Sequence, residues 1–315
     1  MFRLSSDIMI GRYRITGVHE VEVRSSWDEL TDTCTLKFPR RADWLGQNLA
    51  SGAAPLLKRN DPVIVNLGYD DDNRQVFQGY ISKLTAEIPV VIECQDTAYL
   101  LKQNTVTKAY KEVELSTLLK DILPSQVPFE APAVRLGQFR ITNATPAKVL
   151  AYLKDNYLIK SWFRGGWLYA GLAYVPELQR THVLRFERNV VDHQLEYLRK
   201  EDVRIKLKAI SMKPDNEKIE IELGDDEGEQ RTIYFYDVSE ADLRNLAEEE
   251  IELLRYEGYR GSLTTFLAPH IQHGDVVDLR SEAYPERDGR YFVKAVTTNF
   301  GMGGGRQTIE LDSKL

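Results

Sequence analysis

The stretch Pro269–Leu279 holds the side chains with the most obvious chemical potential, namely His270, His273, Asp275 and Asp278. Imidazole and carboxylate groups are common metal ligands, so a metal site is one interpretation. His270 and His273 would share a face only on a helix, however, and Pro269 and Gly274 bracket a loop here. The favoured interpretation is a turn that leads into a strand, and the sequence predicts no metal or cofactor.

Residues 301–305, Gly-Met-Gly-Gly-Gly, resemble a phosphate-binding loop in composition. That chemistry needs a strand before the loop, a helix after it and a Lys-Ser/Thr pair. Here a strand follows and no such pair is present, so the segment is expected to be a flexible hairpin tip. The other histidines, His19, His182 and His193, have no partner that spacing identifies.

Four aromatic side chains surround the Gly165-Gly166 turn: Trp162, Phe163, Trp167 and Tyr169. An exposed cluster of this kind can stack on sugar rings or anchor a protein interface. The favoured alternative packs the aromatics onto a helix expected at Val149–Leu153. Because successive strand residues point to opposite faces, about half of them would be exposed.

Carboxylates are numerous in one further segment, which contains Asp225, Asp226, Glu227 and Glu229. A pair of carboxylates is the machinery of glycoside hydrolysis, so a count alone leaves that reaction open. Gly224 and Gly228 place the run in a turn, however, where solvated charge is the ordinary state. No G-x-S-x-G nucleophile motif occurs, and the sequence predicts no catalytic, cofactor-binding or metal-binding residue.

The chain has 315 residues, a length that predicts about two domains. Its 16 Tyr and 11 Phe against 4 Met favour β structure. The net charge of −7 argues against stable nucleic-acid binding, which needs a basic surface. Apolar runs are far shorter than the ~20 residues of a membrane helix, and no signal-peptide core is evident. We therefore expect a protein made in a cytoplasm that does not insert into membranes, with Cys34 and Cys94 reduced and buried.

Period-2 alternation predicts strands in both outer parts of the chain. In the first hundred residues these are Met9–Ile15, His19–Ser25, Asp32–Phe38, Pro62–Leu67, Val76–Leu84 and Val90–Gln95, with a looser segment at Arg40–Ala54. Towards the end they are Val203–Met212, Lys218–Leu223, Thr232–Tyr236, Ser262–Leu267, Val276–Leu279, Arg290–Thr298 and Thr308–Leu311, with a turn at Pro214–Asn216.

Helical spacing appears in three places. Leu115–Leu123 ends at Pro124, and a second helix starts with Thr145 as N-cap and runs to about Asn156. Next to it, a Gly165-Gly166 turn predicts a β-hairpin. A third, longer helix is capped by Ser239 and is expected to end at Gly258 and Gly261.

The two β regions repeat the same features in the same order. Asn60-Asp61-Pro62-Val63 resembles Gly274-Asp275-Val276-Val277, and an acidic loop follows each. Phe77 lies 16 residues after Asp61, and Tyr291 lies 16 residues after Asp275. Any two β-meanders share some features, but the agreement in order and spacing favours a duplicated barrel with an α+β unit inserted between the copies.

The ordered set of motifs resembles the contractile-tail baseplate hub family, which includes phage late control protein D, Mu-like tail proteins and the N-terminal half of the type VI secretion spike VgrG. The motifs that carry the resemblance are Leu57–Val63, Leu67–Asp70, Phe77–Ile81, Ile88-Pro89, Glu93–Asp96, Leu100–Gln103, Thr145–Leu150, Gly166–Tyr169, Gly261–Leu267, His273–Val277, Tyr291–Val293 and Gln307–Leu311. The resemblance implies two similar barrels per chain and a trimer that forms a pseudo-six-fold ring. It also implies contacts with the tail tube, with a spike on a separate chain and with other baseplate proteins.

The sequence thus predicts an α+β, mainly β protein in which two similar antiparallel β-barrels flank a small α+β domain. The expected domains are residues 1–104, 105–182 and 183–315, the last with a long helix at about 239–257. The predicted function is that of a non-enzymatic homotrimeric hub in a virion tail baseplate or injection particle. If the strand edges at Val63–Leu67 and Val276–Leu279 meet in the ring, charge substitutions on them should disrupt assembly. A carbohydrate-binding or cell-wall-degrading module is the alternative.

Overall fold

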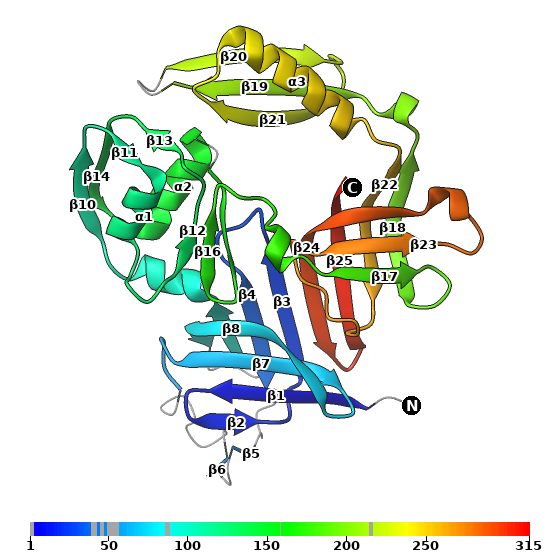
Figure 1. The fold of residues 1–315 in the computed structure, drawn as a ribbon. Helices are drawn as coiled ribbons and strands as arrows, with labels where there is room; N and C mark the ends of the chain where they lie inside the picture. The colour runs from blue at the N-terminus through cyan, green and yellow to red at the C-terminus, as the bar shows by residue number, and fades with distance from the viewer. Residues whose placement is uncertain are drawn as a thin grey trace.

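The computed structural model describes residues 3–38, 43–44, 47–48, 57–85, 89–157, 159–213 and 217–315. The expected segment at Arg40–Ala54 falls largely outside these residues, and the expected turn at Pro214–Asn216 does so entirely. The chain is mainly β, as predicted, and most of its strands belong to one large sheet (Figure 1). No helix in the described part of the chain is both long and apolar enough to cross a membrane.

Thirteen strands form the large sheet, and they come from both ends of the chain. Those from the N-terminal part are β1 (Leu4–Ile10), β2 (Tyr13–Ile15), β3 (Glu20–Ser26), β4 (Thr33–Phe38), β7 (Pro62–Tyr69), β8 (Asp72–Thr85) and β9 (Val90–Gln95). Those from the C-terminal part are β17 (Thr181–Arg185), β18 (Val190–Leu198), β22 (Gly258–Thr265), β23 (Val276–Arg280), β24 (Gly289–Gly301) and β25 (Gly304–Lys314). A separate pair, β5 (Asp43–Trp44) and β6 (Gln47–Asn48), follows β4 in sequence.

Period-2 alternation places one face of each strand in a core, as in β4, where Cys34, Leu36 and Phe38 are buried. The expected strand Met9–Ile15 is instead two strands, β1 and β2, which pair as a hairpin. Gly11 adopts a φ of +57° at this turn, a conformation that residues with a Cβ rarely adopt.

The two halves of the sheet have the same strand order. The N-terminal half runs β3-β4-β9-β8-β7-β1, and the C-terminal half runs β18-β22-β25-β24-β23-β17. The halves differ at one end, because β1 pairs antiparallel with β7 whereas β17 pairs parallel with β23. Among the described residues the longest path ends at β2 and at β18. Closure of each half into a barrel therefore stays a prediction.

The turn before β7 and the turn before β23 are built alike. Asp61 Oδ2 accepts a hydrogen bond from the Lys58 amide at 2.9 Å, and Asp275 Oδ2 accepts one from the Gln272 amide at 3.1 Å. The residue before each aspartate has a positive φ, +75° at Asn60 and +80° at Gly274. The repeat noticed in the sequence is thus also a repeat of strand order and of turn geometry.

One ladder joins the two halves into a continuous sheet. Strand β3 pairs antiparallel with β24 from Glu20↔Gly301 to Ser26↔Ala295. Leu267 and Phe300, from the C-terminal half, are buried in the hydrophobic core of the N-terminal half. The strands Val63–Leu67 and Val276–Leu279 lie inside this sheet with a partner on each side. Their backbone edges are therefore not free for ring contacts, which corrects the interface considered at these two strands.

The middle of the chain, drawn in cyan to green in Figure 1, folds around a hydrophobic core that also includes Ile210 and Met212 from later in the chain. Its elements are the 3-10 helix η2 (Thr97–Lys102), β10 (Val106–Tyr110), β11 (Val113–Glu114), α1 (Leu115–Ile122), β12 (Phe129–Glu130), β13 (Arg135–Leu136), β14 (Phe139–Ala144), α2 (Pro146–Tyr157), β15 (Ser161–Arg164) and β16 (Trp167–Ala170). Both helices lie where the sequence predicts them, and Thr145 Oγ1 accepts the Lys148 amide hydrogen bond expected of an N-cap. Other short 3-10 helices lie at Pro176–Leu178, Lys200–Asp202 and Pro285–Arg287.

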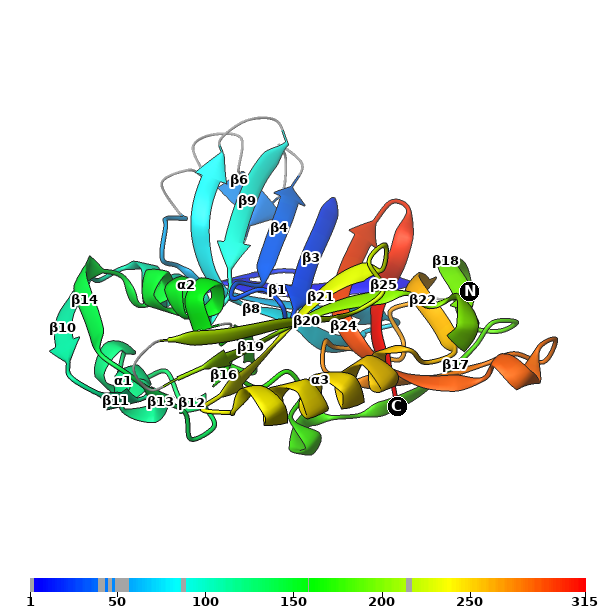
Figure 2. The ribbon, with the colours of Figure 1, turned by 90° about the horizontal axis from the view of Figure 1, so that it is seen from above.

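A third unit departs from the expected second barrel. Strands β19 (Ile205–Met212), β20 (Lys218–Gly224) and β21 (Glu229–Tyr236) form a sheet of their own, and α3 (Glu240–Leu254) packs on one face of it. Figure 2 shows this helix lying along the three strands. Ser239 caps α3 as predicted, but the helix ends at Leu254 and not near Gly258, which begins β22. A Cβ at Gly258 would lie only 2.6 Å from the Tyr291 hydroxyl, so close strand packing explains this glycine better than helix termination does.

Candidate functional site

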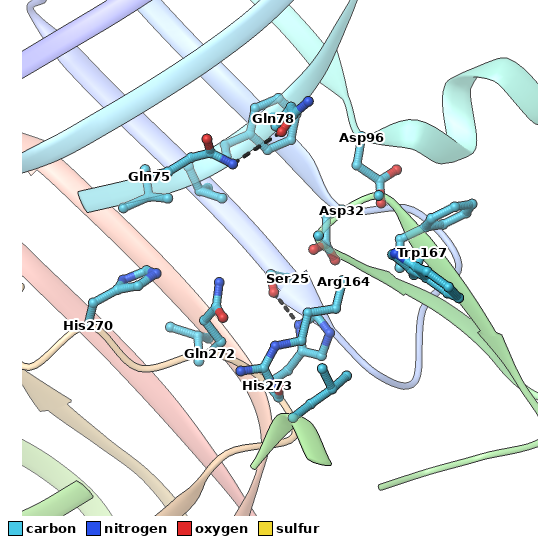
Figure 3. Close-up of a pocket in the computed structure, with 18 of the residues that line it drawn as sticks. Ser25, Asp32, Gln75, Gln78, Asp96, Arg164, Trp167, His270, Gln272 and His273 are labelled. Carbon is cyan, nitrogen blue, oxygen red and sulfur yellow. Dashed lines mark hydrogen bonds between the residues drawn. The ribbon is translucent and has the colours of Figure 1, made fainter. Parts of the chain in front are cut away.

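A polar cavity of about 590 Å³ lies where three parts of the chain meet. Strands β3 and β8 supply Ser25, Gln75 and Gln78, and the β15–β16 hairpin supplies Arg164 and Trp167. The loop before β23 supplies His270, Gln272 and His273, and the start of η2 supplies Asp96. Figure 3 shows side chains from these segments around one space. Junctions between folded units are favoured positions for binding sites, so this cavity is the candidate site.

One wall of the cavity is an ion pair that holds the hairpin against the loop before β23. Arg164 Nη2 donates to Asp275 Oδ1 at 2.7 Å, and Arg164 Nη1 donates to the His273 carbonyl oxygen at 3.1 Å. The side chains of Arg164 and Asp275 are only 9% and 1% exposed. The local fold brings the arginine here, because the Gly165-Gly166 turn, with φ of +60° and +83°, reverses the chain directly after it.

Four other residues contact the carboxylate of Asp275. Besides Arg164, His182 Nε2 lies 3.1 Å from Oδ2, and the amides of Arg180 and Gln272 donate to the carboxylate. Burial alone would raise the pKa of Asp275, but the bond to His182 and the charge of Arg164 outweigh it and hold the pKa below its usual range. Asp275 is therefore an ionised structural anchor.

Ser25 and His273 form the pair that most resembles catalytic machinery, since Ser25 Oγ lies 2.5 Å from His273 Nδ1. Burial and the positive charge of Arg164 lower the pKa of His273 to about 3. A general base works best with a pKa near the working pH, and a serine hydrolase surrounds the histidine with negative charge. Here the charge next to the imidazole is positive, so the pair is a poor nucleophile–base couple.

Two carboxyl groups mark the opposite end of the cavity in Figure 3. The Asp96 amide donates to the Asp32 carbonyl oxygen at 3.1 Å, which places the two residues side by side. Burial and the neighbouring charge of Asp96 raise the pKa of Asp32 well above its usual range. Burial raises the pKa of Asp96 to about 7. The cavity therefore has carboxyl groups at one end and imidazole groups at the other.

The residues singled out in the sequence are only partly brought together. His270 and His273 do line the cavity, and Asp275 is bound to the lining residue Arg164, whereas Asp278 pairs with Arg280 at 2.7 Å on the surface of β23. No group of residues suited to a metal ion occurs in the described ranges. The acidic run pairs with surface cations, with Asp225 bound to Arg255 and Glu229 bound to Arg231. Residues 301–305 form the β24–β25 hairpin turn, as predicted.

The aromatic cluster is mostly buried, as the favoured interpretation expects, but only Phe163 packs with α2, whereas Trp162 and Tyr169 belong to a separate cluster and fewer than half of the four are exposed. Trp162 stacks on Tyr169 with ring centroids 4.6 Å apart, and Phe163 packs in the same core as α2. Only Trp167 remains open to solvent, with 46% of its surface exposed at the cavity rim.

Sequence reasoning missed Ser25, Asp32, Asp96 and Arg164 as site residues. The sequence position of Asp96 could have pointed to it, because this residue ends the strand motif Glu93–Asp96 and stands in the N-cap position of η2. The position of Arg164 could also have done so, because it is the charged residue next to the Gly-Gly turn. Nothing in the sequence places Ser25 near His273, because the two residues are 248 positions apart.

Comparisons with known proteins agree with this architecture. A tail protein from Neisseria meningitidis MC58 superposes with a TM-score of 0.65 at 14% identity, covering 99% of this chain and 96% of its own. The 43 kDa tail protein of prophage MuSo2 from Shewanella oneidensis gives 0.63 at 12% identity, with 99% and 97% covered. An Escherichia coli component of the type VI secretion system gives 0.60 at 12% identity, with 97% and 76% covered. The chain has the fold of these tail and secretion proteins.

This tail-protein fold confirms, at the level of architecture, the resemblance drawn from the ordered sequence motifs. No protein-family model and no curated protein matches the sequence. The likeness is thus carried by structure, because strand order and core positions tolerate sequence changes that preserve their apolar pattern.

Proposed function

We propose that this chain is a structural hub protein of a phage, prophage or related contractile injection system, in which three copies form a ring that joins the tail tube to the central spike. The observation that carries the proposal is the tail-protein fold, which extends over 99% of the chain. The duplicated strand order supports it. Three chains with two similar halves each present six similar units, and such a ring adapts a six-fold tube to a three-fold spike.

A closed ring of three identical chains needs an interface between two different surfaces of each copy. The strands Val63–Leu67 and Val276–Leu279 have partners on both sides, so their backbone edges are not available for it. The sheet path ends at β2 and β18, whose outer edges have no ladder in the described part of the chain. These two strands are the better candidates for contacts between copies.

The proposed partners are the tube protein on one face of the ring, a spike on a separate chain on the other, and other baseplate proteins around it. The protein would be made in the bacterial cytoplasm and would function in a tail baseplate or injection particle. Its net charge of −7 suits a conduit, because an acidic wall repels DNA and does not retain it.

The proposed role involves no catalysis. The serine–histidine pair at the cavity has a base whose pKa is about 3, and its neighbouring cation, Arg164, disfavours the imidazolium that hydrolysis requires. Both charged groups of the adjacent ion pair are buried and engaged with each other. These features suit a rigid junction between folded units.

Light scattering coupled to size exclusion, followed by negative-stain imaging, tests the proposal. We expect a stable trimer, or a trimer that forms when the cognate tube and spike proteins are added, and ring-shaped particles in the images. A chain that stays monomeric in both conditions would contradict the hub role.

A carbohydrate-binding or cell-wall-degrading module is the second candidate, and the exposed ring of Trp167 at the cavity rim is the observation that favours it. This function predicts a monomer that pulls down with peptidoglycan or cleaves it, and a loss of that activity in Trp167→Ala. Retained trimerisation without glycan binding would exclude it.

A further inference from the structure

Asp96 carries a buried oxygen that the protein leaves without a partner. The residue is only 6% exposed, and its Oδ1 accepts a hydrogen bond from the Ala98 amide at 3.1 Å as the cap of η2. Its Oδ2 is buried and has no hydrogen-bond partner in the described part of the chain. Leaving a buried acceptor unsatisfied is costly, and more so when the group is ionised. Asp96 Oδ2 is therefore an acceptor that a bound donor could satisfy.

The cations nearest to this end of the cavity are engaged elsewhere. Lys102 Nζ, on η2, donates to Thr31 Oγ1 at 3.0 Å and to Gln95 Oε1 at 2.7 Å. Arg164 is held by Asp275 on the opposite wall. Asp32 adds a second carboxyl group beside Asp96, and its Oδ1 accepts a hydrogen bond from the Ser26 amide at 3.1 Å. The charge of Lys102 lowers the pKa of Asp96, but neither Lys102 nor Arg164 forms an ion pair with Asp96 or Asp32 in the described part of the chain.

The rim next to this end presents an aromatic ring. Trp167 is 46% exposed, and Figure 3 draws it on the same side of the cavity as Asp32 and Asp96. The Gly165-Gly166 turn brings it there, since a Cβ at Gly166 would lie 4.0 Å from Thr97 Oγ1, the residue after Asp96. Carboxylates beside an aromatic face are a favourable setting for a guanidinium or ammonium group.

We propose that the acidic end of this cavity binds an arginine or lysine side chain of another protein chain, with Asp96 as its ionic partner, Asp32 as a further hydrogen-bond acceptor and Trp167 over its aliphatic or planar part. The cavity, at about 590 Å³, is larger than one such side chain needs, so it also has room for the loop that carries it. A basic side chain complements the carboxyl groups of this site, because an acidic partner segment would leave both of them unpaired. The site adds a specific protein contact that the hub role does not require.

The affinity of the site for the arginine or lysine side chain should increase with pH. Asp96, with a pKa of about 7, must be ionised to pair with the cation, so affinity rises as the pH rises through that value. The groups that face it are Asp32 from the segment before β4 and Lys102 from η2. The other ionisable groups that line the cavity are Arg164, Tyr169, Glu177, Arg180, His270 and His273. Burial holds the pKa values of His270 and His273 below their usual range, so neither histidine gains a charge between about pH 6.5 and 8.

The test uses the whole chain and two blocked peptides, acetyl-Gly-Arg-Gly-amide and acetyl-Gly-Gln-Gly-amide, followed by calorimetry and tryptophan fluorescence. At about pH 8 we expect the arginine peptide to bind and the glutamine peptide not to bind. Asp96→Asn keeps the Oδ1 acceptor for the η2 cap, so the fold is preserved while binding weakens at least about tenfold. Asp32→Asn is a second variant with the same expected direction.

Glu177→Gln is the matched control, because Glu177 lines the same cavity but lies outside the carboxyl pair. It should bind the arginine peptide as the unaltered chain does. Equal binding by Asp96→Asn and the unaltered chain, an equal loss in Glu177→Gln, or no binding of the arginine peptide at about pH 8 would each overturn the proposal. None of these outcomes bears on trimer formation, so the site and the hub role fail or succeed separately.

Discussion

His273 and Asp96 lie at opposite ends of one cavity, and burial shifts their proton affinities in opposite directions. The imidazole of His273 is buried next to Arg164, which keeps it neutral. Burial of the Asp96 carboxyl group raises its pKa and favours its protonated form. Both groups therefore prefer to be uncharged, and each makes the stability of the fold depend on pH.

The variant His273→Asn isolates the histidine. The unfolded chain protonates this residue near pH 6.5, whereas the folded chain does so only near its pKa of about 3. Stability from the neutral imidazole is therefore present above pH 6.5 and is lost as the pH falls. We expect the difference in unfolding free energy between the unaltered chain and the variant to shrink by about 1.4 kcal/mol per pH unit below that value, as measured by urea denaturation. A difference that stays constant with pH would contradict the burial of a neutral histidine.

Asp96→Asn should show the opposite trend. A carboxyl group with a folded pKa of about 7 binds its proton more tightly than the unfolded chain does, so it destabilises the fold increasingly as the pH rises from about 4 to about 7. The variant is expected to be more stable than the unaltered chain at neutral pH and to lose that advantage near pH 4. Thermal unfolding across this range measures the effect.

At the scale of elements, the β15–β16 hairpin acts as a clamp between the middle of the chain and the loop before β23. Its two-glycine turn places Arg164 at the end of β15, directly against Asp275. The pair lies 111 residues apart in sequence, and both side chains are withdrawn from solvent. Breaking such a pair leaves one buried charge without compensation.

Arg164→Ala is therefore expected to lower the unfolding free energy by about 3–5 kcal/mol. Arg188→Ala is the matched control, because the Arg188–Glu282 pair has a similar separation in sequence but is largely exposed. Its loss should cost at most about 1 kcal/mol. Guanidinium denaturation of both variants measures the difference, and equal costs would show that the clamp adds no more than a surface pair.

For the whole molecule, the continuous sheet makes the two similar halves one structure. The β3–β24 ladder crosses from one half to the other, and Phe300 reaches from β24 into the core of the N-terminal half. The halves cannot separate without breaking this ladder and exposing that core. We infer that they unfold together.

Phe300→Ala tests this coupling. Phe300 is 6% exposed, so its truncation should cost about 3–5 kcal/mol and lower the stability of both halves in a single transition. Met302→Ala, two residues further along the same hairpin and 92% exposed, should leave stability nearly unchanged. Calorimetry combined with hydrogen exchange reports both halves. Two separate transitions in Phe300→Ala would show that the halves are independent.

The sequence by itself determined the features that depend on neighbouring residues. Thr145 and Ser239 begin helices, Gly165-Gly166 turns a hairpin, and the matched turns at Asp61 and Asp275 show the repeat. These are local because caps, periodicity and turn geometry act within a few residues. The C-terminal end of α3 was misplaced, since Gly258 serves close packing against Tyr291, a contact that no local pattern records.

Only the tertiary structure decided how distant segments meet. The β3–β24 ladder, the separate sheet of β19–β21 and the cavity shared by Ser25, Asp96 and His273 all join residues that spacing does not relate. The physical reason is that a strand's alternating pattern specifies which face is buried but not which strand lies beside it. Burial then turned ordinary aspartates and histidines into groups with shifted pKa values, an effect that depends on the surroundings and not on the residue type.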